Sequence, residues 1–274
     1  MSGSPSGFCI PVDLGNPGQF FACCGLLELA DRLWADVTGR FDCARVPSRF
    51  EVAAQAPASL HDLLLDAARL DFDVGKDEAE DYETEDSALH PIVIKRPVSL
   101  VLDWWSEKSI KPWAGSMKER AILHAMLRAI DPDSLDPLND AKAVFDPLPP
   151  AEAGKRRKKP EKREPFYFDS RRGSNAHPLD SGFSPDVHQK ESICFPAVEA
   201  MCFVGLQRAR PQTTGEPNES RYTVWTRPMP VNAIAPVVCG LARIQGSLTF
   251  EFKNIFRTDQ RKHKCFARAV RVKE

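Results

Sequence analysis

The order of strand-like and helix-like segments is the feature that most constrains the fold of this chain. Residues 8–12 form a short apolar run typical of a buried strand. Asn16-Pro-Gly-Gln19 then supplies an N-cap residue, a proline for the first turn and a glutamine at the capping-box position. Later apolar segments are short and do not alternate regularly with helices. This order favours an α+β fold, with a mostly antiparallel sheet and flanking helices, over parallel βαβ units. A ferredoxin-like or RRM-like core with insertions is compatible with it.

Apolar periodicity and turn residues divide the chain into further elements. Ser59 and Ser116 are predicted N-caps, the second with Glu119 at its capping-box position. In the first helix, an apolar stripe runs from Phe20 to Trp34. Predicted helices cover residues 19–34, 60–68, 117–130 and 197–207, and predicted strands cover residues 8–12, 40–46, 49–53, 98–104, 166–168, 222–226, 247–252 and 265–272.

The near-neutral total charge hides a strong asymmetry along the sequence. The whole chain has 37 Lys and Arg against 38 Asp and Glu. Residues 1–150 hold 14 basic and 25 acidic residues, a net charge of −11, and residues 151–274 hold 23 and 13, a net charge of +10. Such a split indicates an anionic partner or contact between the halves. We therefore predict an acidic α+β part over 1–150, a basic linker or mobile loop over 151–164 and a basic part over 165–274, the two parts packed as one domain.

Segments for targeting or membrane insertion are not evident. No stretch approaches the roughly 20 apolar residues that span a bilayer, and residues 1–7 lack the features of a signal peptide. The sequence therefore predicts a cytoplasmic protein without membrane contact. In that reducing compartment, most of the eight cysteines are expected to be small buried apolar residues.

Residues for catalysis or metal binding form no recognisable constellation. The chain contains no Walker-A sequence, dinucleotide-binding glycine motif, H-E-x-x-H or G-x-S-x-G. His61-Asp62 resembles a metal-phosphohydrolase dipeptide but lacks other clustered ligands. We therefore predict a protein that is not an enzyme and needs no cofactor or metal. The alternative, a metal-dependent nuclease or RNA-processing enzyme, would use Asp169, Asp180 and Asp186, with His177 or His188. The least implausible ligands for another metal site are His188, Cys194, His263 and Cys265.

Basic residues with neighbouring aromatics favour a nucleic-acid partner. Phosphate contacts from Lys and Arg dominate nucleic-acid affinity, and aromatic rings stack on unpaired bases. Seven of the nine residues from 155 to 163 are basic. The Gly-Ser loop before the predicted helix at 117 also suits a phosphate. The predicted contacts are Lys111, Trp113, Lys118, Lys155, Arg156, Arg157, Lys158, Lys159, Arg171, Arg172, Phe183, Arg208 and Arg210. Of these, Trp113 and Phe183 are the candidate stacking residues. In the alternative interpretation, the aromatics are core residues and the charges form a solvated face.

Four motifs in order resemble CRISPR-associated proteins of type I-G (formerly I-U) loci. They are the opening I-P-V-D-L-G-N-P-G-Q-F-F-A-C-C-G-L-L of residues 10–27, continuing to residue 33; K-P-W-A-G at 111–115; F-D-S-R-R-G at 168–173, continuing to D-S-G-F-S-P-D at 180–186; and P-A-V-E at 196–199, continuing to R-A-R-P at 208–211.

This resemblance implies a non-catalytic subunit of a crRNA-guided surveillance complex for antiviral defence. Such a subunit binds crRNA, target DNA or both, beside the other effector subunits, and a separate helicase-nuclease is recruited for cleavage. The position of the large subunit, which usually reads the flanking DNA motif, is preferred here. A backbone or foot subunit with RRM-like topology is the close competitor, and a scaffold that binds only protein is a further alternative.

Overall fold

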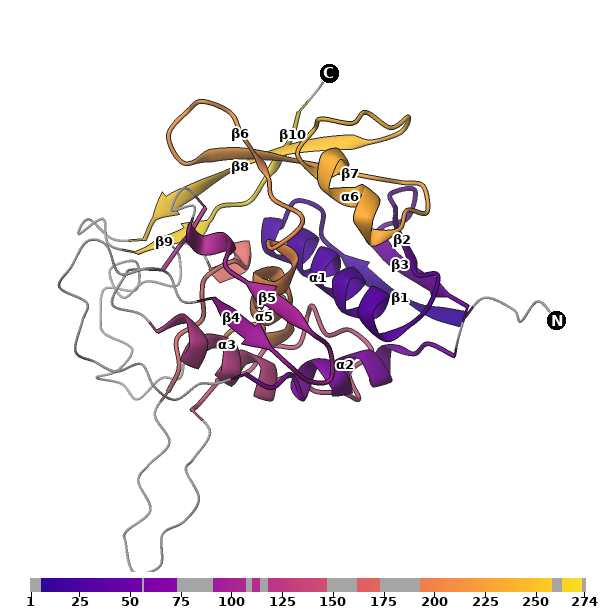
Figure 1. Cartoon of the computed structure of the whole chain (residues 1–274). Helices are drawn as coiled ribbons and strands as arrows, with labels where there is room; N and C mark the ends of the chain where they lie inside the picture. The colour runs from indigo at the N-terminus through magenta and orange to yellow at the C-terminus, as the bar shows by residue number, and fades with distance from the viewer. Residues whose placement is uncertain are drawn as a thin grey trace, which may run out of the picture.

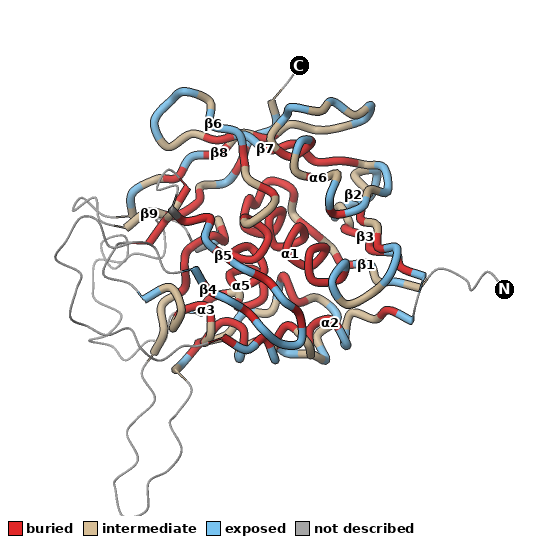
Figure 2. Tube along the Cα trace, in the orientation of Figure 1, coloured by how far each residue is buried: buried red, intermediate tan, exposed pale blue. Residues whose placement is uncertain are grey.

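The computed structural model describes residues 6–55, 57–72, 91–106, 110–113, 118–146, 162–172, 193–257 and 263–272. Helices α1 (Pro17–Leu33) and α5 (Pro196–Gly205) lie at the centre, and the other elements surround them (Figure 1). Both central helices are drawn almost entirely as buried in Figure 2. Every residue from Pro17 to Ala30 is buried. The predicted single apolar stripe is therefore too narrow a description of α1, since the helix is enclosed on all sides.

A three-stranded antiparallel sheet packs against α1. It contains β1 (Ser6–Val12), β3 (Ser48–Ala54) and β2 (Thr38–Asp42) in the order β1-β3-β2. Side chains on one face alternate into the core, as Ile10, Phe41 and Phe50 show. Together with α1 and α2 (Leu60–Ala68), the strands follow the first five elements of a ferredoxin-like unit. A fourth strand beside β1 is not found in the described ranges, so the complete ferredoxin-like or RRM-like core stays a prediction.

A second antiparallel sheet lies across the other side of α1 (Figure 1). Its strands β6 (Gln212–Thr213), β7 (Glu219–Val224), β8 (Leu248–Phe256) and β10 (Val270–Arg271) have the order β10-β8-β7-β6, and β9 (Lys264–Phe266) also pairs with β8. The two sheets are joined where Gly39 and Met229 exchange backbone hydrogen bonds of 2.9 and 3.0 Å. The fold class is thus α+β with antiparallel sheets, as predicted.

Smaller elements complete the structure. They are the hairpin β4 (Ile92–Ile94) and β5 (Leu100–Leu102), the short 3₁₀ helices η1 (Trp104–Ser106) and η2 (Ser170–Arg172), α3 (Glu119–Arg128) and α6 (Val231–Val238). In Figure 1 the β4 and β5 strands lie in front of the central helices and α3 lies below them, whereas α6 lies above α1 beside β7. One continuous apolar cluster contains residues from both α1 and α5, and hence from both charge halves of the sequence.

Several predicted elements differ from those in the structure. Helix α3 begins at Glu119 with Lys118 as its N-cap, whereas the predicted cap, Ser116, lies outside the described residues. Helix α6 was missed because Pro230 caps it and Pro236 lies inside it, and prolines usually indicate a loop. The predicted strand at 166–168 is irregular backbone, with Tyr167 at φ +71°. The predicted strand at 265–272 is divided between β9 and β10.

Candidate functional site

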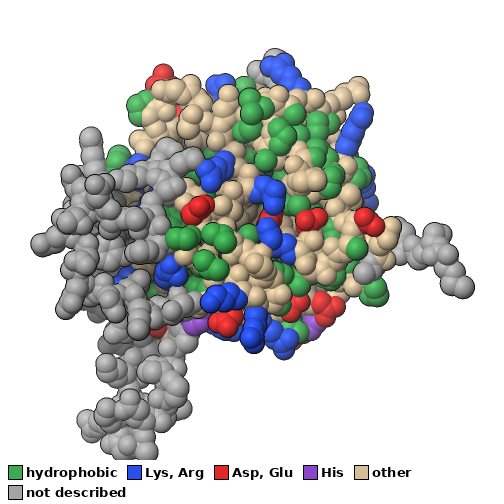
Figure 3. Space-filling model, viewed as in Figure 1, with side chains coloured by type: hydrophobic (Ala, Val, Ile, Leu, Met, Phe, Trp, Pro, Cys, Tyr) green, Lys and Arg blue, Asp and Glu red, His purple; other side chains and the backbone are tan. Residues whose placement is uncertain are grey.

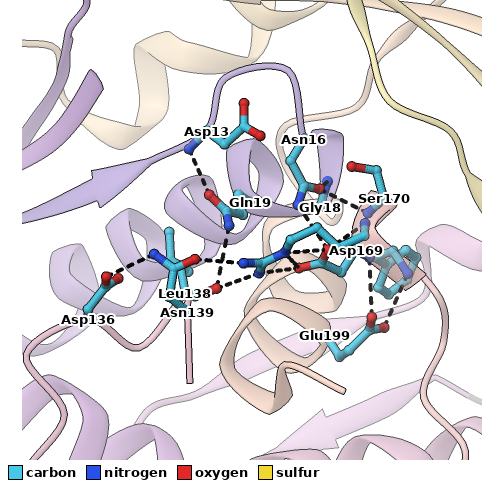
Figure 4. A network of polar contacts seen from close by, with 12 residues as sticks. Asp13, Asn16, Gly18, Gln19, Asp136, Leu138, Asn139, Asp169, Ser170 and Glu199 are labelled. Carbon is cyan, nitrogen blue, oxygen red and sulfur yellow. Dashed lines mark hydrogen bonds and ion pairs between the residues drawn. The ribbon is translucent and has the colours of Figure 1, made fainter. Parts of the chain in front are cut away.

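A buried polar network surrounds the first turn of α1 (Figure 4). Asn16 is fully buried and caps the helix, since its Oδ1 accepts a hydrogen bond of 3.1 Å from the Gly18 backbone. The same oxygen accepts the Ser170 backbone N–H at 3.1 Å, and Asn16 Nδ2 donates to Asp169 Oδ1 at 2.9 Å. One N-cap side chain therefore fixes both α1 and the start of η2, which lies more than 150 residues later.

Glu199, on the first turn of α5, holds the same segment from the other side. Its two carboxylate oxygens accept the backbone N–H groups of Phe168 and Asp169, each at 3.2 Å, and its side chain is fully buried. In a strand, consecutive N–H groups point in opposite directions, so they cannot converge on one carboxylate. The left-handed Tyr167 permits this convergence, which explains why residues 166–168 do not form the predicted strand.

The approach of α1 to this segment leaves no space for a side chain at Gly18. A Cβ atom built there would lie 2.4 Å from the Phe168 carbonyl oxygen, which is backbone and cannot move aside. The glycine of the N-P-G-Q motif is therefore required by packing between the first motif and the third.

Arg171 is fully engaged in this network. Its guanidinium pairs with Asp169, with Nη2 at 2.6 Å from Oδ2, and donates to Asn139 Oδ1 at 2.6 Å and to the Leu138 carbonyl at 2.7 Å. Its Cζ also lies 3.4 Å from the centre of the Phe195 ring. The predicted contact from Arg171 to a phosphate stays a prediction, and in the structure this arginine is held by internal partners.

Gln19 also attaches the turn around residue 138 to the network. Gln19 Nε2 donates to the Leu138 carbonyl at 3.4 Å, and its Oε1 accepts the Asp13 backbone N–H at 2.7 Å. Gln19 thus reaches Asp13 instead of closing the predicted capping box on Asn16. Asn139 Nδ2 donates to Asp136 Oδ2 at 2.8 Å. The network therefore joins α1, η2, α5 and this turn into one frame.

Chemically, this frame is suited to holding backbone in place. Both oxygens of Asp169 accept hydrogen bonds from Arg171, so the carboxylate is already occupied by a cation. Within the described ranges, no group of three or more His, Cys, Asp or Glu side chains could hold a metal ion. The other candidate ligands of the nuclease alternative, Asp180, Asp186, His177 and His188, lie outside those ranges.

A second charged cluster lies at the other end of α1. Glu28 is 3% exposed, and both Arg32 and Arg208 donate to it, with Arg208 Nε at 2.5 Å and Arg32 Nε at 2.9 Å. Burial by itself raises the pKa of Glu28, but the hydrogen bonds from Arg208 and Arg32 outweigh it and hold the pKa below its ordinary value. Arg208, predicted to contact phosphate, is thus bound to α1.

The remaining predicted site residues are dispersed or lie outside the described part. Trp113 is 4% exposed and packs among the rings of Trp104, Phe166 and Phe203, so it is a core residue and cannot stack on a base in this conformation. Lys111 lies with its Nζ 5.0 Å from the Trp113 ring centre. Lys118 is exposed, and Arg210 is half-buried. The side chain of Arg172, the basic run Lys155, Arg156, Arg157, Lys158 and Lys159, and Phe183 lie outside the described residues.

The polar residues that form the frame were not recognised as a group from the sequence. Asn16 and Gln19 were interpreted only as local capping residues. Glu199 and Glu28 are charged residues within strongly apolar helices, and that mismatch was the available signal. A buried carboxylate must be paired or hydrogen-bonded, so each indicates partners elsewhere in the chain.

The cysteines give a direct test of the packing. Five of the eight, Cys23, Cys24, Cys194, Cys202 and Cys265, are buried, in agreement with the prediction. Burial raises the pKa of Cys265 to about 11 and also raises those of Cys23, Cys24 and Cys202. At pH 8 we expect a thiol reagent to label Cys9 and Cys239 rapidly, Cys43 more slowly because partial burial and Asp42 raise its pKa, and the other five only after denaturation. Fast labelling of all eight cysteines in the native protein would contradict this core.

Of the helices in the described part, none is both long and apolar enough to cross a membrane. Comparison with protein-family models, curated proteins and solved structures found no significant match to this sequence or fold.

Proposed function

We propose that the chain is a non-catalytic, nucleic-acid-binding subunit of a crRNA-guided surveillance complex of type I, acting in the cytoplasm. The observation that carries the proposal is the convergence of motifs. The motifs that begin at residues 10, 168 and 196 resemble one family, and Asn16, Asp169 and Glu199, one from each, are linked through hydrogen bonds. The motif at 111 lies beside β9, since Lys264 N donates to the Pro112 carbonyl at 2.8 Å. The motifs that carry the resemblance thus meet in one hydrogen-bonded network, and this convergence supports the resemblance.

The distribution of charge refines this proposal. On the face in Figure 3, Lys and Arg side chains are interspersed with Asp and Glu and do not merge into one basic surface. Several cations of the basic half are paired internally, such as Arg208 with Glu28 and Arg221 with Glu251 at 2.7 Å. Nucleic acid would therefore meet local groups of cations and not the whole basic half of the sequence.

The large-subunit position remains our preferred assignment within such a complex. The competing backbone or foot position draws support from the β1-α1-β2-β3-α2 order, which is the beginning of an RRM-like unit. The outward face of that sheet carries Cys9, Arg40 and Glu51 in one row and no aromatic residue in its described β1–β3 rows, whereas RRM sheets stack bases on aromatics. Base stacking on this sheet face is therefore disfavoured.

The test is co-purification with nucleic acid. The chain is expressed with the proteins encoded beside its gene and a CRISPR array, purified through a tag on the chain and deproteinised. We expect a stable assembly that contains RNA of guide length, and binding of matched DNA that weakens steeply as salt increases. The chain expressed without the array is the control.

Two results would contradict this proposal. Co-purification of the neighbouring proteins without nucleic acid at low salt would favour the protein-only scaffold. Cleavage of labelled crRNA precursor by the chain alone with Mg²⁺ would favour the enzyme, although among the described residues Asp169 is already paired with Arg171.

A further inference from the structure

Three segments far apart in the sequence meet around β9. The Lys264 backbone N–H donates to the Pro112 carbonyl at 2.8 Å, and the Phe266 N–H donates to the Tyr167 carbonyl at 3.1 Å. The opposite edge of β9 pairs with β8, where Phe256 stands opposite Lys264. One end of the second sheet is thus built from residues near 111, 167, 256 and 264.

A cation lies against an aromatic ring in each of these segments. Arg257 Cζ is 3.3 Å from the centre of the Tyr167 ring, Lys264 Nζ is 5.1 Å from the Phe256 ring, and Lys111 Nζ is 5.0 Å from the Trp113 ring. Ring faces attract cations and hold them in place without neutralising their charge. We call the group Lys111, Phe256, Arg257 and Lys264 the β9 patch.

Two charges of this patch, those of Arg257 and Lys264, differ from those of the internally paired arginines. Within the described ranges, neither Arg257 nor Lys264 contacts a carboxylate. Lys264 Nζ donates to the neutral Asn218 Oδ1 at 2.6 Å, and Arg257 Nε is buried without an acceptor. Partial burial lowers the pKa of Lys264, because the ammonium loses hydration. A phosphate oxygen at the exposed parts of these two side chains would supply the missing negative charge.

Binding of single-stranded nucleic acid also requires an exposed aromatic ring on which a base can stack. Phe256 is 39% exposed, whereas Tyr167 and Trp113 are almost fully buried and can only support the cations above them. A guanidinium held flat on a ring also offers its plane to an unpaired base. From this geometry we infer that the β9 patch binds single-stranded nucleic acid, with Lys111, Arg257 and Lys264 contacting phosphates and Phe256 stacking on a base. The inference deepens the proposed function and rests on it for the identity of the strand.

The first test removes charge from the patch in the full-length chain. Fluorescent 20-nucleotide oligo(U) RNA and oligo(dT) DNA serve as probes in anisotropy titrations over a range of salt concentrations. With three phosphate contacts on a single strand, log K should fall with log salt at a slope of about −2, and Arg257→Gln/Lys264→Gln should reduce the slope to about −0.7. Affinity near 0.1 M salt should fall by roughly tenfold or more. The matched control is Arg227→Gln/Arg243→Gln, which removes two exposed charges at the opposite end of β8.

The second test separates stacking from charge. Phe256→Leu keeps an apolar side chain but removes the aromatic face, and should lower affinity by about tenfold, while Phe256→Tyr should retain it. Equal affinities of the wild type, both Phe256 variants and the charge variant would overturn the inference even if the assembly contains crRNA. Failure of the wild-type chain to bind either probe at low salt would overturn it as well. If the chain joins no crRNA assembly but still binds the probes through the β9 patch, the inference holds and the proposed function is wrong. The stronger of the RNA and DNA responses identifies the strand.

Discussion

Adding one methyl group at Gly25 is expected to lower the free energy of unfolding by about 3 kcal/mol or more, the upper end of the range for overpacked cores. A Cβ built at Gly25 in α1 lies 2.0 Å from the Met201 carbonyl oxygen of α5. A Cβ at Gly205 lies 2.1 Å from the Phe21 carbonyl oxygen, so the two helices approach through both glycines. Because these contacts are with backbone, the helices must separate to accept Gly25→Ala.

The expected sign is opposite to that of helix propensity. In an exposed helix, replacing Gly by Ala stabilises by about 1 kcal/mol, so any loss at Gly25 must come from the helix contact. Since domains of this kind are stable by about 5–15 kcal/mol, a loss of this size is readily measured. Urea unfolding followed by tryptophan fluorescence should show a lower midpoint at an unchanged slope.

Gly15→Ala is the matched control for the same chemical change. Its added Cβ would meet Arg268 Nη2 at 3.0 Å, at the end of a side chain that is 65% exposed and can move. We expect a loss below about 1 kcal/mol at this position. A Gly25→Ala protein with the wild-type midpoint would mean that α1 and α5 do not pack as closely as described.

The contrast between Gly25 and Gly15 shows which features of the fold local sequence patterns can predict and which they cannot. The α1 and α5 segments, the Asn16 and Ser59 caps and the strand β1 follow from periodicity and capping residues, which act over a few neighbours. That Gly25 meets Met201 is a contact across about 175 residues of sequence, and no local pattern encodes it. The α+β class could be predicted because it depends on the order of elements alone.

The predicted phosphate contacts depend on the same distinction between local and distant information. A run of arginines in a polar segment suggests phosphate contacts, yet Arg171 and Arg208 are paired with Asp169 and Glu28 from other positions in the fold. Conversely, Lys264 looks ordinary in its own segment and gains significance from the pairing of β9. Counting charges identifies a basic half of the sequence, but the partners of each cation in the folded chain decide whether it can bind a phosphate.

The Asp169–Arg171 pair provides the second large effect, with an asymmetry that its burial predicts. Asp169 is fully buried, whereas the Arg171 side chain is 31% exposed. Arg171→Met should therefore cost about 3–5 kcal/mol, because it leaves an uncompensated carboxylate in the core. Asp169→Asn should cost less, about 1–3 kcal/mol, because the guanidinium keeps Asn139 and the Leu138 carbonyl and can reach water.

A double-mutant cycle makes this prediction specific to the pair. The double variant Asp169→Asn/Arg171→Met removes both charges, so its loss of stability should fall short of the sum of the single losses by about 1 kcal/mol or more. Arg268→Met is the control, since Arg268 pairs with Asp13 on the surface, where both side chains are exposed, and its loss should stay below about 1 kcal/mol.

Nucleic-acid binding by the Arg171→Met variant decides whether Arg171 only stabilises the fold or also contacts a phosphate. Nucleic-acid affinity of Arg171→Met must be measured well below its own unfolding midpoint, because an unfolded fraction would imitate a lost phosphate contact. If Arg171 only braces the network, the folded variant should bind single strands with the wild-type salt slope, since no phosphate contact has been removed. An Arg171→Met variant with unchanged stability but a salt slope smaller by about 0.7 would contradict the structural role of Arg171. It would show that Arg171 contacts a phosphate and that the Asp169 carboxylate does not depend on its charge.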